Sequence, residues 1–358
     1  MSGRPRVGVL TFHRCINYGS FWQAKCLVDG LRERGFDAEI LDHRSSRIEF
    51  AELRCALNPT LPTPVPRGDR PLYRTKAEQF FRAFESLPLS RPFCVDEPPP
   101  TSAYDTIVVG SDEVWNLQHP WFGGKAIFFG DGPRGRKLIA HAASFGHYRA
   151  DHGLADEWRQ RLRRFDHISV RDDNARRLVE TATGFSPPLA LDPCLQFPNH
   201  IDSSGAPEST EPYVVVYGHN FSESFARRVR NGAESRGLPL ISIGYRNDWA
   251  DCQRLTAGPR EFAAFMAGAT AVATNFFHGC VFALLNRRPF VCEASAYRSV
   301  KVRCLMEAVG GLRHVMEEGT PEAVSNDCLA NPPSPEIEQR IAELRAASDE
   351  YLNRALAN

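Results

Sequence analysis

A histidine in the second half of the chain has the setting of a catalytic side chain. His278 follows the short apolar run Ala271–Thr274 and precedes Gly279, at a predicted turn from a strand into a helix. A histidine at such a turn can donate or accept a proton near neutral pH. A histidine satisfied by its neighbours in a core would more often lie inside an element. We therefore predict His278 as a catalytic residue and place Asn275 and Gly279 beside it in the substrate site.

Two adjacent carboxylates follow another apolar run. Ser111, Asp112 and Glu113 come after the segment Thr106–Val109 and a single glycine. One of these carboxylates can act as a base toward a hydroxyl group. The structural alternative is a helix N-cap, a role that an aspartate after a serine fills well. We predict Asp112 as a second catalytic residue and Ser111 as a substrate contact.

An arginine follows a third predicted strand. Arg171 follows the segment His167–Val170 and precedes Asp172 and Asp173. A guanidinium at the end of a strand can hold a carboxylate or a phosphate in bidentate fashion. An ordinary ion pair with Asp172 or Asp173 is the alternative. We predict Arg171 as the third catalytic residue.

The first loop of the chain offers a site for an anion. It extends from His13 to Ser20, and its glycine permits a tight turn into a helix whose first N–H groups attract negative charge. The alternative is a plain helix cap made by Asn17 or Ser20. The loop lacks the glycine-rich dinucleotide fingerprint, and no Walker lysine follows it. The predicted substrate contacts of this loop are His13, Asn17, Tyr18 and Gly19.

A short basic segment follows the apolar run Pro289–Cys292. Arg298 and Lys301 in this segment can hold a phosphate, and we include both as predicted substrate contacts. The alternative is a basic loop that is simply solvated.

All of these candidates lie at the ends of predicted strands or close to them. Ligands of open α/β sheets bind beyond the carboxyl ends of the strands. The chain begins with a strand at Val7–Leu10, a helix over residues 21–34 and a strand over residues 38–42, which is a βαβ unit with parallel strands. Further strands are predicted at 106–109, 137–140, 167–170, 189–192, 212–217, 240–243, 271–274 and 289–292.

The chain is too long for one compact core, since it has 358 residues. The polar stretch 199–211 is the best candidate for a linker. We expect a Rossmann-like domain over residues 1–198 and a second over residues 212–334, followed by a C-terminal helix over 335–358. A proline-rich insertion at 47–103 contains one helix (75–86) and is expected to pack beside the first domain or to cover the cleft.

Composition narrows the class of protein. Forty-three basic residues balance forty-three acidic ones, which argues against nucleic acid as a partner. The ten cysteines are scattered without close pairs, so neither a metal site nor a disulfide framework is predicted. No apolar run is long enough for a membrane span, and no signal segment is recognisable. We therefore expect a cytoplasmic protein without a cofactor, whose oligomeric state stays open.

The motifs, taken in order, resemble those of the polysaccharide pyruvyl transferase family. The resemblance extends over most of the chain, and it is the ordered set that makes it specific. The motifs are TFHRCINYGSFWQAKCLVDGL, YDTIVVGSDEVWN, AASFG, ISVRDD, LDPCL, GPREFAAFMAGATAVATNFFHG and RPF.

The resemblance implies an α/β fold of two facing Rossmann-like domains, as in glycosyltransferase-B-like enzymes, with the C-terminal helix crossing back. It also implies phosphoenolpyruvate as donor and a pair of sugar hydroxyls as acceptor, on a glycan or its precursor. The product would be a pyruvate ketal, with release of phosphate. In that reaction His278 would be the general acid, Arg171 would hold the donor, and Asp112 would orient or deprotonate the acceptor.

One position departs from the family pattern. Some members carry an arginine two residues before the histidine, where it helps to bind the donor, but this chain has Phe276. Anion binding then falls to Arg171, Arg298, Lys301 or Arg14, or the donor is not phosphoenolpyruvate. A related transferase with another donor, in specialised metabolite assembly, and a non-catalytic sugar-binding relative are the alternatives.

Overall fold

A computed structural model describes residues 4–132, 136–205, 211–294 and 299–357 of the chain. The chain divides into two compact units. The first consists of Met1–Phe50, Ser86–His200 and Ala342–Asn358, and the second of Ala51–Glu85 and Ile201–Ile341. Two helices cross the boundary along the chain, α2 (Ser46–Leu57) and α12 (Pro335–Leu356).

The first unit is built on a parallel sheet of five strands in the order β2-β1-β5-β6-β7. The four residues of β5 are all buried, as are the last four of β1, which fits strands covered on both faces. These strands are β1 (Arg6–Leu10), β2 (Asp37–Ile40), β5 (Thr106–Val109), β6 (Lys137–Ala143) and β7 (His167–Val170). A separate parallel pair is formed by β3 (His43–Arg44) and β4 (Phe93–Cys94).

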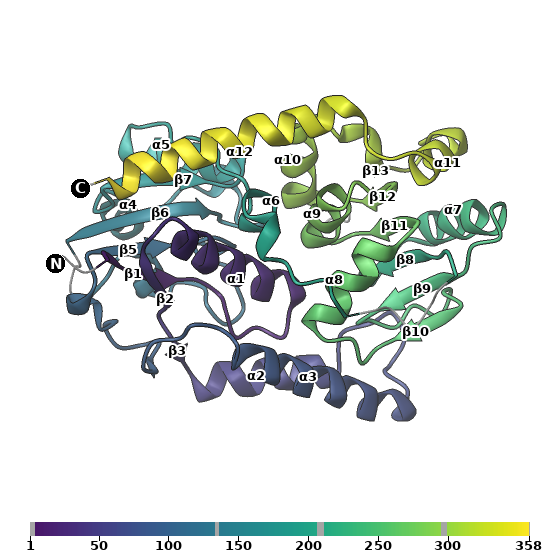
Figure 1. Cartoon of the computed structure of the whole chain (residues 1–358), viewed down its shortest axis with the longest axis horizontal. Helices are drawn as coiled ribbons and strands as arrows, with labels where there is room; N and C mark the ends of the chain where they lie inside the picture. Colours follow the sequence, from purple (N-terminus) through teal and green to yellow (C-terminus); the bar gives the residue numbers. More distant parts are fainter. Residues whose placement is uncertain (1–3, 133–135, 206–210, 295–298, 358) are drawn as a thin grey trace. The chain divides into compact units, whose positions relative to one another are not determined.

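Helices of the first unit pack on this sheet. The helix α1 (Tyr18–Glu33) approaches the chain after α6 so closely that a Cβ on Gly30 would lie 2.6 Å from the ring of Phe197. The last turns of α12 lie beside β6 and β7, where the Tyr351 hydroxyl donates to the carbonyl of Ala140 (2.7 Å; Figure 1). The remaining helices are α4 (Asp156–Leu162), α5 (Asp173–Thr183) and α6 (Pro193–Gln196).

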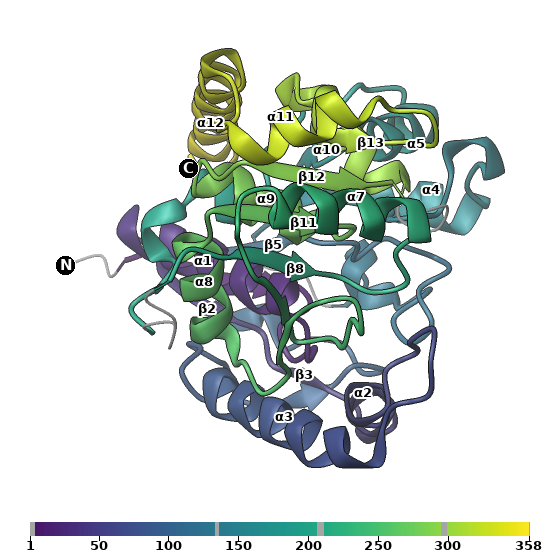
Figure 2. The ribbon, with the colours of Figure 1, turned by 90° about the vertical axis from the view of Figure 1, so that its right-hand side faces the viewer.

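The second unit contains a parallel sheet of six strands in the order β10-β9-β8-β11-β12-β13. Three of its strands, β8, β11 and β12, lie side by side in Figure 2. The strands are β8 (Val214–Tyr217), β9 (Leu240–Ile243), β10 (Cys252–Arg254), β11 (Ala271–Thr274), β12 (Phe290–Glu293) and β13 (Val315–Met316). The two sheets of parallel strands confirm the α/β class predicted from the sequence.

Each face of the second sheet has its own helices. One face, with Val214 and Val216, packs against α7 (Glu223–Glu234) and α11 (Glu322–Ala330). On the other face, the Tyr217 ring packs against Phe262 of α8 (Pro259–Gly268), with centroids 4.6 Å apart and ring planes tilted by 59°. The helices α9 (Phe277–Leu285) and α10 (Ser299–Val309) complete the unit. Alternate side chains of β8 therefore point to different helices, as the pleat requires.

The segment 51–85 was expected to belong to a first-domain insertion, and the structure differs. Its helix α3 (Arg70–Phe84) counts with the second unit, whereas residues 47–50 and 86–103 remain with the first. The backbone N–H of Arg246 donates to the Tyr73 hydroxyl (3.1 Å), and a Cβ on Gly258 would lie 2.8 Å from the side chain of Gln79. The apolar stripe of α3 is therefore buried in the second unit.

Other sequence-based boundaries also shift. The predicted strand at 189–192 is only an isolated bridge between Leu189 and Val170, after which Pro193 begins α6. The predicted C-terminal helix over 335–358 corresponds to α12, which ends at Leu356.

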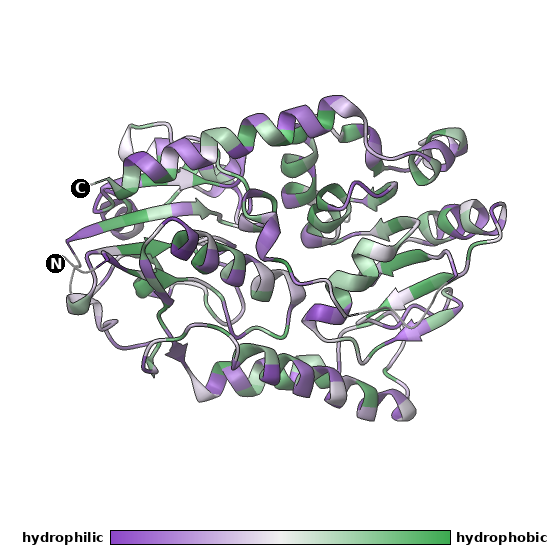
Figure 3. Ribbon diagram, viewed as in Figure 1, coloured by the Kyte–Doolittle hydropathy of each residue, from purple (hydrophilic) through white to green (hydrophobic). Residues whose placement is uncertain are grey.

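Hydropathy follows this layered arrangement. Figure 3 shows largely hydrophobic strands in both sheets and a mixed pattern along α12, which is exposed on one side.

All ten cysteines are free thiols. Among the described residues, no helix combines the length and the apolar character needed to cross a membrane.

Candidate active site

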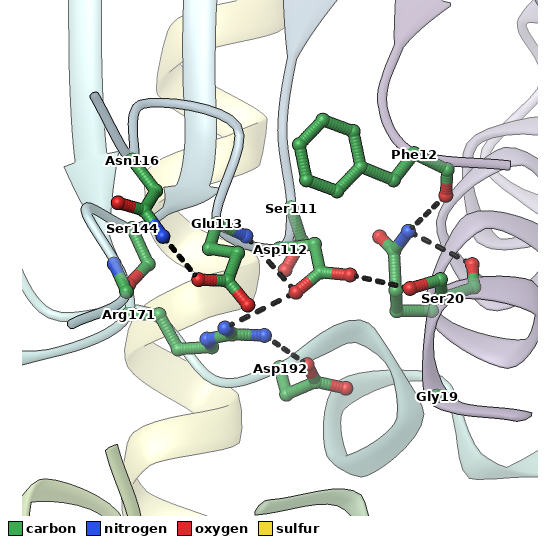
Figure 4. Close-up of polar contacts among 12 residues, drawn as sticks. Phe12, Gly19, Ser20, Ser111, Asp112, Glu113, Asn116, Ser144, Arg171 and Asp192 are labelled. Carbon is green, nitrogen blue, oxygen red and sulfur yellow. Dashed lines mark hydrogen bonds and ion pairs between the residues drawn. The ribbon is translucent and has the colours of Figure 1, made fainter. Parts of the chain in front are cut away.

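Polar side chains of the first unit converge where β1, β5, β6 and β7 end. Figure 4 shows Ser20, Asp112, Arg171 and Asp192 directed toward one another from four different segments. All four are largely buried: the side chains of Arg171, Asp112 and Asp192 are 4%, 9% and 0% exposed. Buried charges at the carboxyl edge of a parallel sheet are typical of a functional site.

Asp112 is fixed by its backbone as well as by its side chain. Its φ of 71° lies in the left-handed region, which non-glycine residues enter mainly where surrounding contacts hold them. The backbone N–H of Ser144 donates to the Asp112 carbonyl (3.0 Å). The preceding Gly110 cannot be replaced without strain, since a Cβ there would lie 2.4 Å from the carbonyl oxygen of His141.

The Asp112 carboxylate accepts hydrogen bonds on both oxygens. The Ser20 hydroxyl donates to Oδ2 (2.9 Å), and the backbone N–H of Glu113 donates to Oδ1 (2.9 Å). Arg171 approaches the same Oδ1 through Nη2 at 3.4 Å. Asp112 is thus held in one orientation and is not the N-cap of a helix.

Arg171 links two carboxylates of the site. Its Nη1 donates to Oδ2 of Asp192 (2.9 Å), in addition to the contact with Asp112. Burial alone would lower the pKa of Arg171, but the charges of Asp112, Asp192 and Asp172 outweigh it and raise the pKa above its ordinary value. The arginine therefore stays cationic. The ion-pair alternative is realised with carboxylates that lie 59 and 21 residues away.

Asp172 and Asp192 also cap helices. Asp172 accepts from the backbone N–H of Ala175 (2.8 Å) as the N-cap of α5. Asp192 accepts from the N–H of Cys194 (3.0 Å) as the N-cap of α6. The carboxylates are thereby positioned by the backbone.

A second polar group lies beside Asp112. The Asn116 side chain donates through Nδ2 to Glu113 Oε2 (2.7 Å) and contacts His147 Nδ1 at 3.1 Å. A Cβ on Gly146 would come within 2.0 Å of the same Glu113 oxygen. The glycine of the AASFG motif therefore makes room for this carboxylate.

The polar side chains of the first loop are held by contacts within the first unit. Asn17 is the N-cap of α1 and accepts from the N–H groups of Gly19 (2.9 Å) and Ser20 (3.2 Å). Tyr18 is 1% exposed, and Gly19 is also buried. His13 is 0% exposed, and its Nε2 lies 3.0 Å from an oxygen of Asp42.

The carboxylate of Asp42 pairs with the charged side chains of this loop. Arg14 donates to it through Nε (2.6 Å) and Nη2 (2.9 Å). Burial would raise the pKa of Asp42, but the hydrogen bonds and charges of Arg14 and His13 outweigh it and hold the pKa well below its usual range. Burial lowers the pKa of the adjacent His43 to about 3. Arg14, which we named from the sequence as an alternative anion-binding residue, is therefore paired with a carboxylate.

Three members of the site were missed from the sequence: Ser20, Gln23 and Asp192. Gln23 is buried and donates through Nε2 to the carbonyls of Phe12 (2.8 Å) and Ser20 (3.0 Å). Asp192 could have been found, because it ends the apolar run Leu189–Leu191 as Asp112 ends its own. Ser20 was considered from the sequence only as a helix cap. Ser111, a predicted contact, is buried, and its hydroxyl has no hydrogen-bond partner within the described residues.

His278, Asn275 and Gly279 belong to the second unit. His278 is the second residue of α9 and is 9% exposed, with its ring 5.1 Å from that of Phe277. A Cβ on Gly279 would lie 1.9 Å from Thr274 Oγ1, so this turn requires glycine. Asn275 donates to the carbonyl of His219 (2.8 Å), and its own Oδ1 is buried without a partner among the described residues.

Phe276 occupies an aromatic setting. Its ring centroid lies 4.9 Å from that of Tyr217 and 5.4 Å from those of His219 and Tyr245, with the ring planes nearly perpendicular (86°, 88° and 86°). The Lys76 ammonium lies 4.3 Å from the centroid of Tyr245 and donates to the Gly244 carbonyl (2.9 Å). Burial lowers the pKa of Lys76 to about 7.

Of the two predicted phosphate contacts, one lies within the described residues. Lys301 lies in the first turn of α10 and is half-buried. Arg298 lies outside the described residues.

Comparisons with known proteins agree with the motif resemblance. The family model described as "Polysaccharide pyruvyl transferase" matches residues 17–297. No curated protein matches the chain.

Several solved structures are similar. The S. aureus MnaA–UDP co-structure has a TM-score of 0.50 at 13% identity and covers 100% of this chain and 98% of its own. Anabaena HepE with UDP-glucose has a TM-score of 0.49 at 13% identity, with 98% and 99% covered. The UDP-GlcNAc 2-epimerase of Neisseria meningitidis has 0.47 at 9%, with 98% and 100% covered. The likeness to MnaA concerns the fold alone and confirms the glycosyltransferase-B-like class.

Proposed function

The chain belongs to the polysaccharide pyruvyl transferase family, and from this premise we propose that it transfers a pyruvyl group from phosphoenolpyruvate to two hydroxyls of a sugar. The family is one of transferases, and the chain is an enzyme of that class. The acceptor is a glycan or a glycosylated small molecule, and the product is a ketal. The observation that carries the proposal is the buried Asp112 carboxylate, fixed between the Ser20 hydroxyl and Arg171.

The proposed reaction needs one general acid and one general base. His278 gives a proton to the methylene carbon of phosphoenolpyruvate, and the adjacent carbon becomes electrophilic. The first sugar hydroxyl adds there and loses its proton to Asp112. The second hydroxyl then adds to the same carbon while the C–O bond to phosphate breaks. One hydroxyl proton ends on the new methyl group, through exchange of Asp112 and His278 with solvent, and the other ends on phosphate.

Asp112 suits the role of base because its carboxylate is already oriented before the substrate binds. Two hydrogen bonds and a guanidinium already orient its carboxylate, and the left-handed backbone at this residue is held by Ser144. A preoriented base contributes typically about 10²–10⁴-fold to a proton-transfer step. Arg171 is thereby assigned as the residue that positions Asp112, in place of the donor clamp expected from the sequence.

The donor's negative charges then need other partners. Arg14 and Arg171 are both paired with aspartates. We assign the donor phosphate to Lys301 and Arg298, with the carboxylate near the first turn of α9 beside His278. The N–H groups of a helix start attract an anion, and this assignment keeps the donor next to its acid.

A second candidate rests on Phe276. The donor-binding arginine of some family members is replaced here by a ring that three other aromatic rings surround. Such a setting favours a ligand with an apolar face over a dianion. The second candidate is therefore a transferase of the same scaffold with a less anionic donor.

Incubation of the full chain with phosphoenolpyruvate and a panel of glycans separates the two. The first candidate predicts phosphate release together with a mass increase of one pyruvyl ketal on the acceptor. Asp112→Asn should slow product formation by about 10²-fold or more, since it removes the base. The neighbouring Asp173→Asn, which alters an exposed pair with Arg176, is the matched control and should stay near wild type. Turnover of another donor, with phosphoenolpyruvate inert, would favour the second candidate.

A further inference from the structure

The first unit contains a polar cavity whose lining includes none of the residues of the Asp112 cluster, and we propose that it is a subsite for an uncharged sugar ring of the acceptor. The cavity has a volume of about 430 Å³ and is lined by residues of the segments 95–98 and 119–132 and by Arg47. Pockets for small ligands usually measure about 300–1,000 Å³. A single saccharide unit with its waters fits this space. The inference rests on the proposed function, since it places part of that reaction's acceptor.

The cavity wall is built before any ligand arrives. His119 accepts through Nδ1 from the backbone N–H groups of Trp121 (3.3 Å) and Phe122 (3.1 Å). Phe122 is buried and stacks on Phe12 at 4.5 Å. The Trp115 indole N–H donates to the Phe128 carbonyl (2.7 Å) and fixes the far end of the same loop. A wall held in this way loses little freedom when a ligand binds.

The charges around the cavity largely neutralise one another. Lys125 forms an ion pair with Asp96 across the two wall segments. Asp131 is held by Arg161 (3.1 Å) and Arg164 (2.6 Å) of the α4 region. Arg47 and Glu97 add one charge of each sign to the lining.

This balance excludes two classes of ligand. A phosphate or nucleotide needs an excess of cations, which the lining lacks. A lipid or other apolar ligand needs a predominantly apolar wall, whereas this lining carries five ionisable side chains besides its histidine.

An uncharged sugar ring is the kind of ligand that fits this lining. Trp121 lines the cavity, is half-buried and lies 5.8 Å from the His119 ring at 68°, and an indole ring can pack against the C–H groups of a pyranose. Carboxylate, guanidinium and ammonium groups bind neighbouring hydroxyls from the ring's edge. Trp121 supplies the contact area and the charged residues supply the orientation.

The cavity shares a connection with the proposed base. The chain leaves β5 through Asp112, continues through Glu113 and Asn116, and reaches His119 of the cavity wall three residues later. One loop between β5 and β6 therefore carries both. An acceptor longer than one sugar would use the cavity for a ring that does not react, and the enzyme would prefer oligosaccharides to monosaccharides.

Binding of the full chain to an array of uncharged oligosaccharides, one to four rings long and without donor, tests the inference. Wild type should bind some arrayed oligosaccharides and bind their monosaccharide components more weakly. Trp121→Ala should weaken binding by about tenfold or more, as loss of a central aromatic anchor does. Trp121→Phe keeps a ring face and should retain most of the binding. Phe185→Ala, at an aromatic residue that is 51% exposed outside the cavity, should bind as wild type.

Two results would overturn the subsite. One is the absence of binding to every arrayed glycan by wild type, and the other is equal binding by Trp121→Ala and wild type. A separate product assay with phosphoenolpyruvate reports on the proposed function. Suppose that glycan binding depends on Trp121 while the product assay yields no pyruvylated acceptor. That combination would support the subsite and refute phosphoenolpyruvate as the donor.

Discussion

Replacement of Arg171 by methionine should strongly destabilise the first unit. The guanidinium lies between Asp112 and Asp192, and the three side chains are 4%, 9% and 0% exposed. Methionine keeps much of the volume but leaves two carboxylates buried without their cation. Removal of one partner from a buried pair costs about 3–5 kcal/mol, because the remaining charge stays desolvated.

The expected change in Tm follows from the size of the unit. The first unit comprises about 180 residues. For domains of about 150–250 residues each kcal/mol shifts Tm by about 2–4 °C, so Arg171→Met should lower Tm by roughly 6–20 °C. The deficit should narrow at acid pH, where protonation of the aspartates removes the buried charge.

Thermal and urea unfolding of wild type and variant at neutral and acid pH measure this effect. The matched control is Arg176→Met, because Arg176 pairs with Asp173 at the surface, where the side chains are 40% and 35% exposed. An exposed pair contributes at most about 1 kcal/mol, so this variant should stay close to wild type. The double variant Arg171→Met/Asp192→Asn should regain part of the loss. Equal Tm values for Arg171→Met and Arg176→Met would refute the buried network.

Three further predictions concern single residues. Gly279→Ala should lower stability by about 1–3 kcal/mol, measured by urea unfolding, because its methyl group would lie 1.9 Å from the Thr274 hydroxyl oxygen. Lys76→Met should be more stable than wild type at neutral pH, and the difference should shrink as the pH rises from about 7 toward 10.5, because the buried amine in wild type has a lowered pKa and the unfolded chain binds its proton more tightly. Ser20→Ala should lower kcat about tenfold and change KM little, in the product assay, because Asp112 loses a hydrogen bond that helps to orient it.

Each of these has a contradicting result. Wild-type stability of Gly279→Ala would mean that the turn can open without cost. A pH-independent difference for Lys76→Met would mean that burial does not lower the pKa of Lys76. A change in KM alone for Ser20→Ala would make the serine a substrate contact and remove it from the orientation of Asp112.

Sequence patterns predicted the strands better than the connections between them. Runs such as Thr106–Val109 and Val214–Tyr217 are buried along their whole length, and an unbroken apolar run of four residues is typical of a strand inside a parallel sheet. The position of Asp112, Arg171 and His278 at strand ends followed from the same rule. The run at 189–192 was wrong as a strand, because prolines on either side limit it to one bridge.

The partners of these residues were beyond sequence reasoning. Arg171 has two aspartates next to it in the chain, yet it donates to Asp112 and Asp192, which only the sheet order β5-β6-β7 brings near. The apolar stripe of α3 similarly predicts a buried face without naming what covers it. His13 contacts Asp42 and Asn17 caps α1, and their role as substrate contacts stays a prediction.

Pyruvyl transfer breaks the C–O bond of the donor, and an isotope in that bond tests the central claim most directly. The full chain would be given phosphoenolpyruvate labelled with ¹⁸O at the oxygen that bridges carbon and phosphorus, together with an oligosaccharide acceptor. The account predicts that the released phosphate carries the label and that the acceptor gains an unlabelled ketal. Release of phosphate without the label would mean that the P–O bond breaks, and it would contradict the assignment of this site to ketal formation.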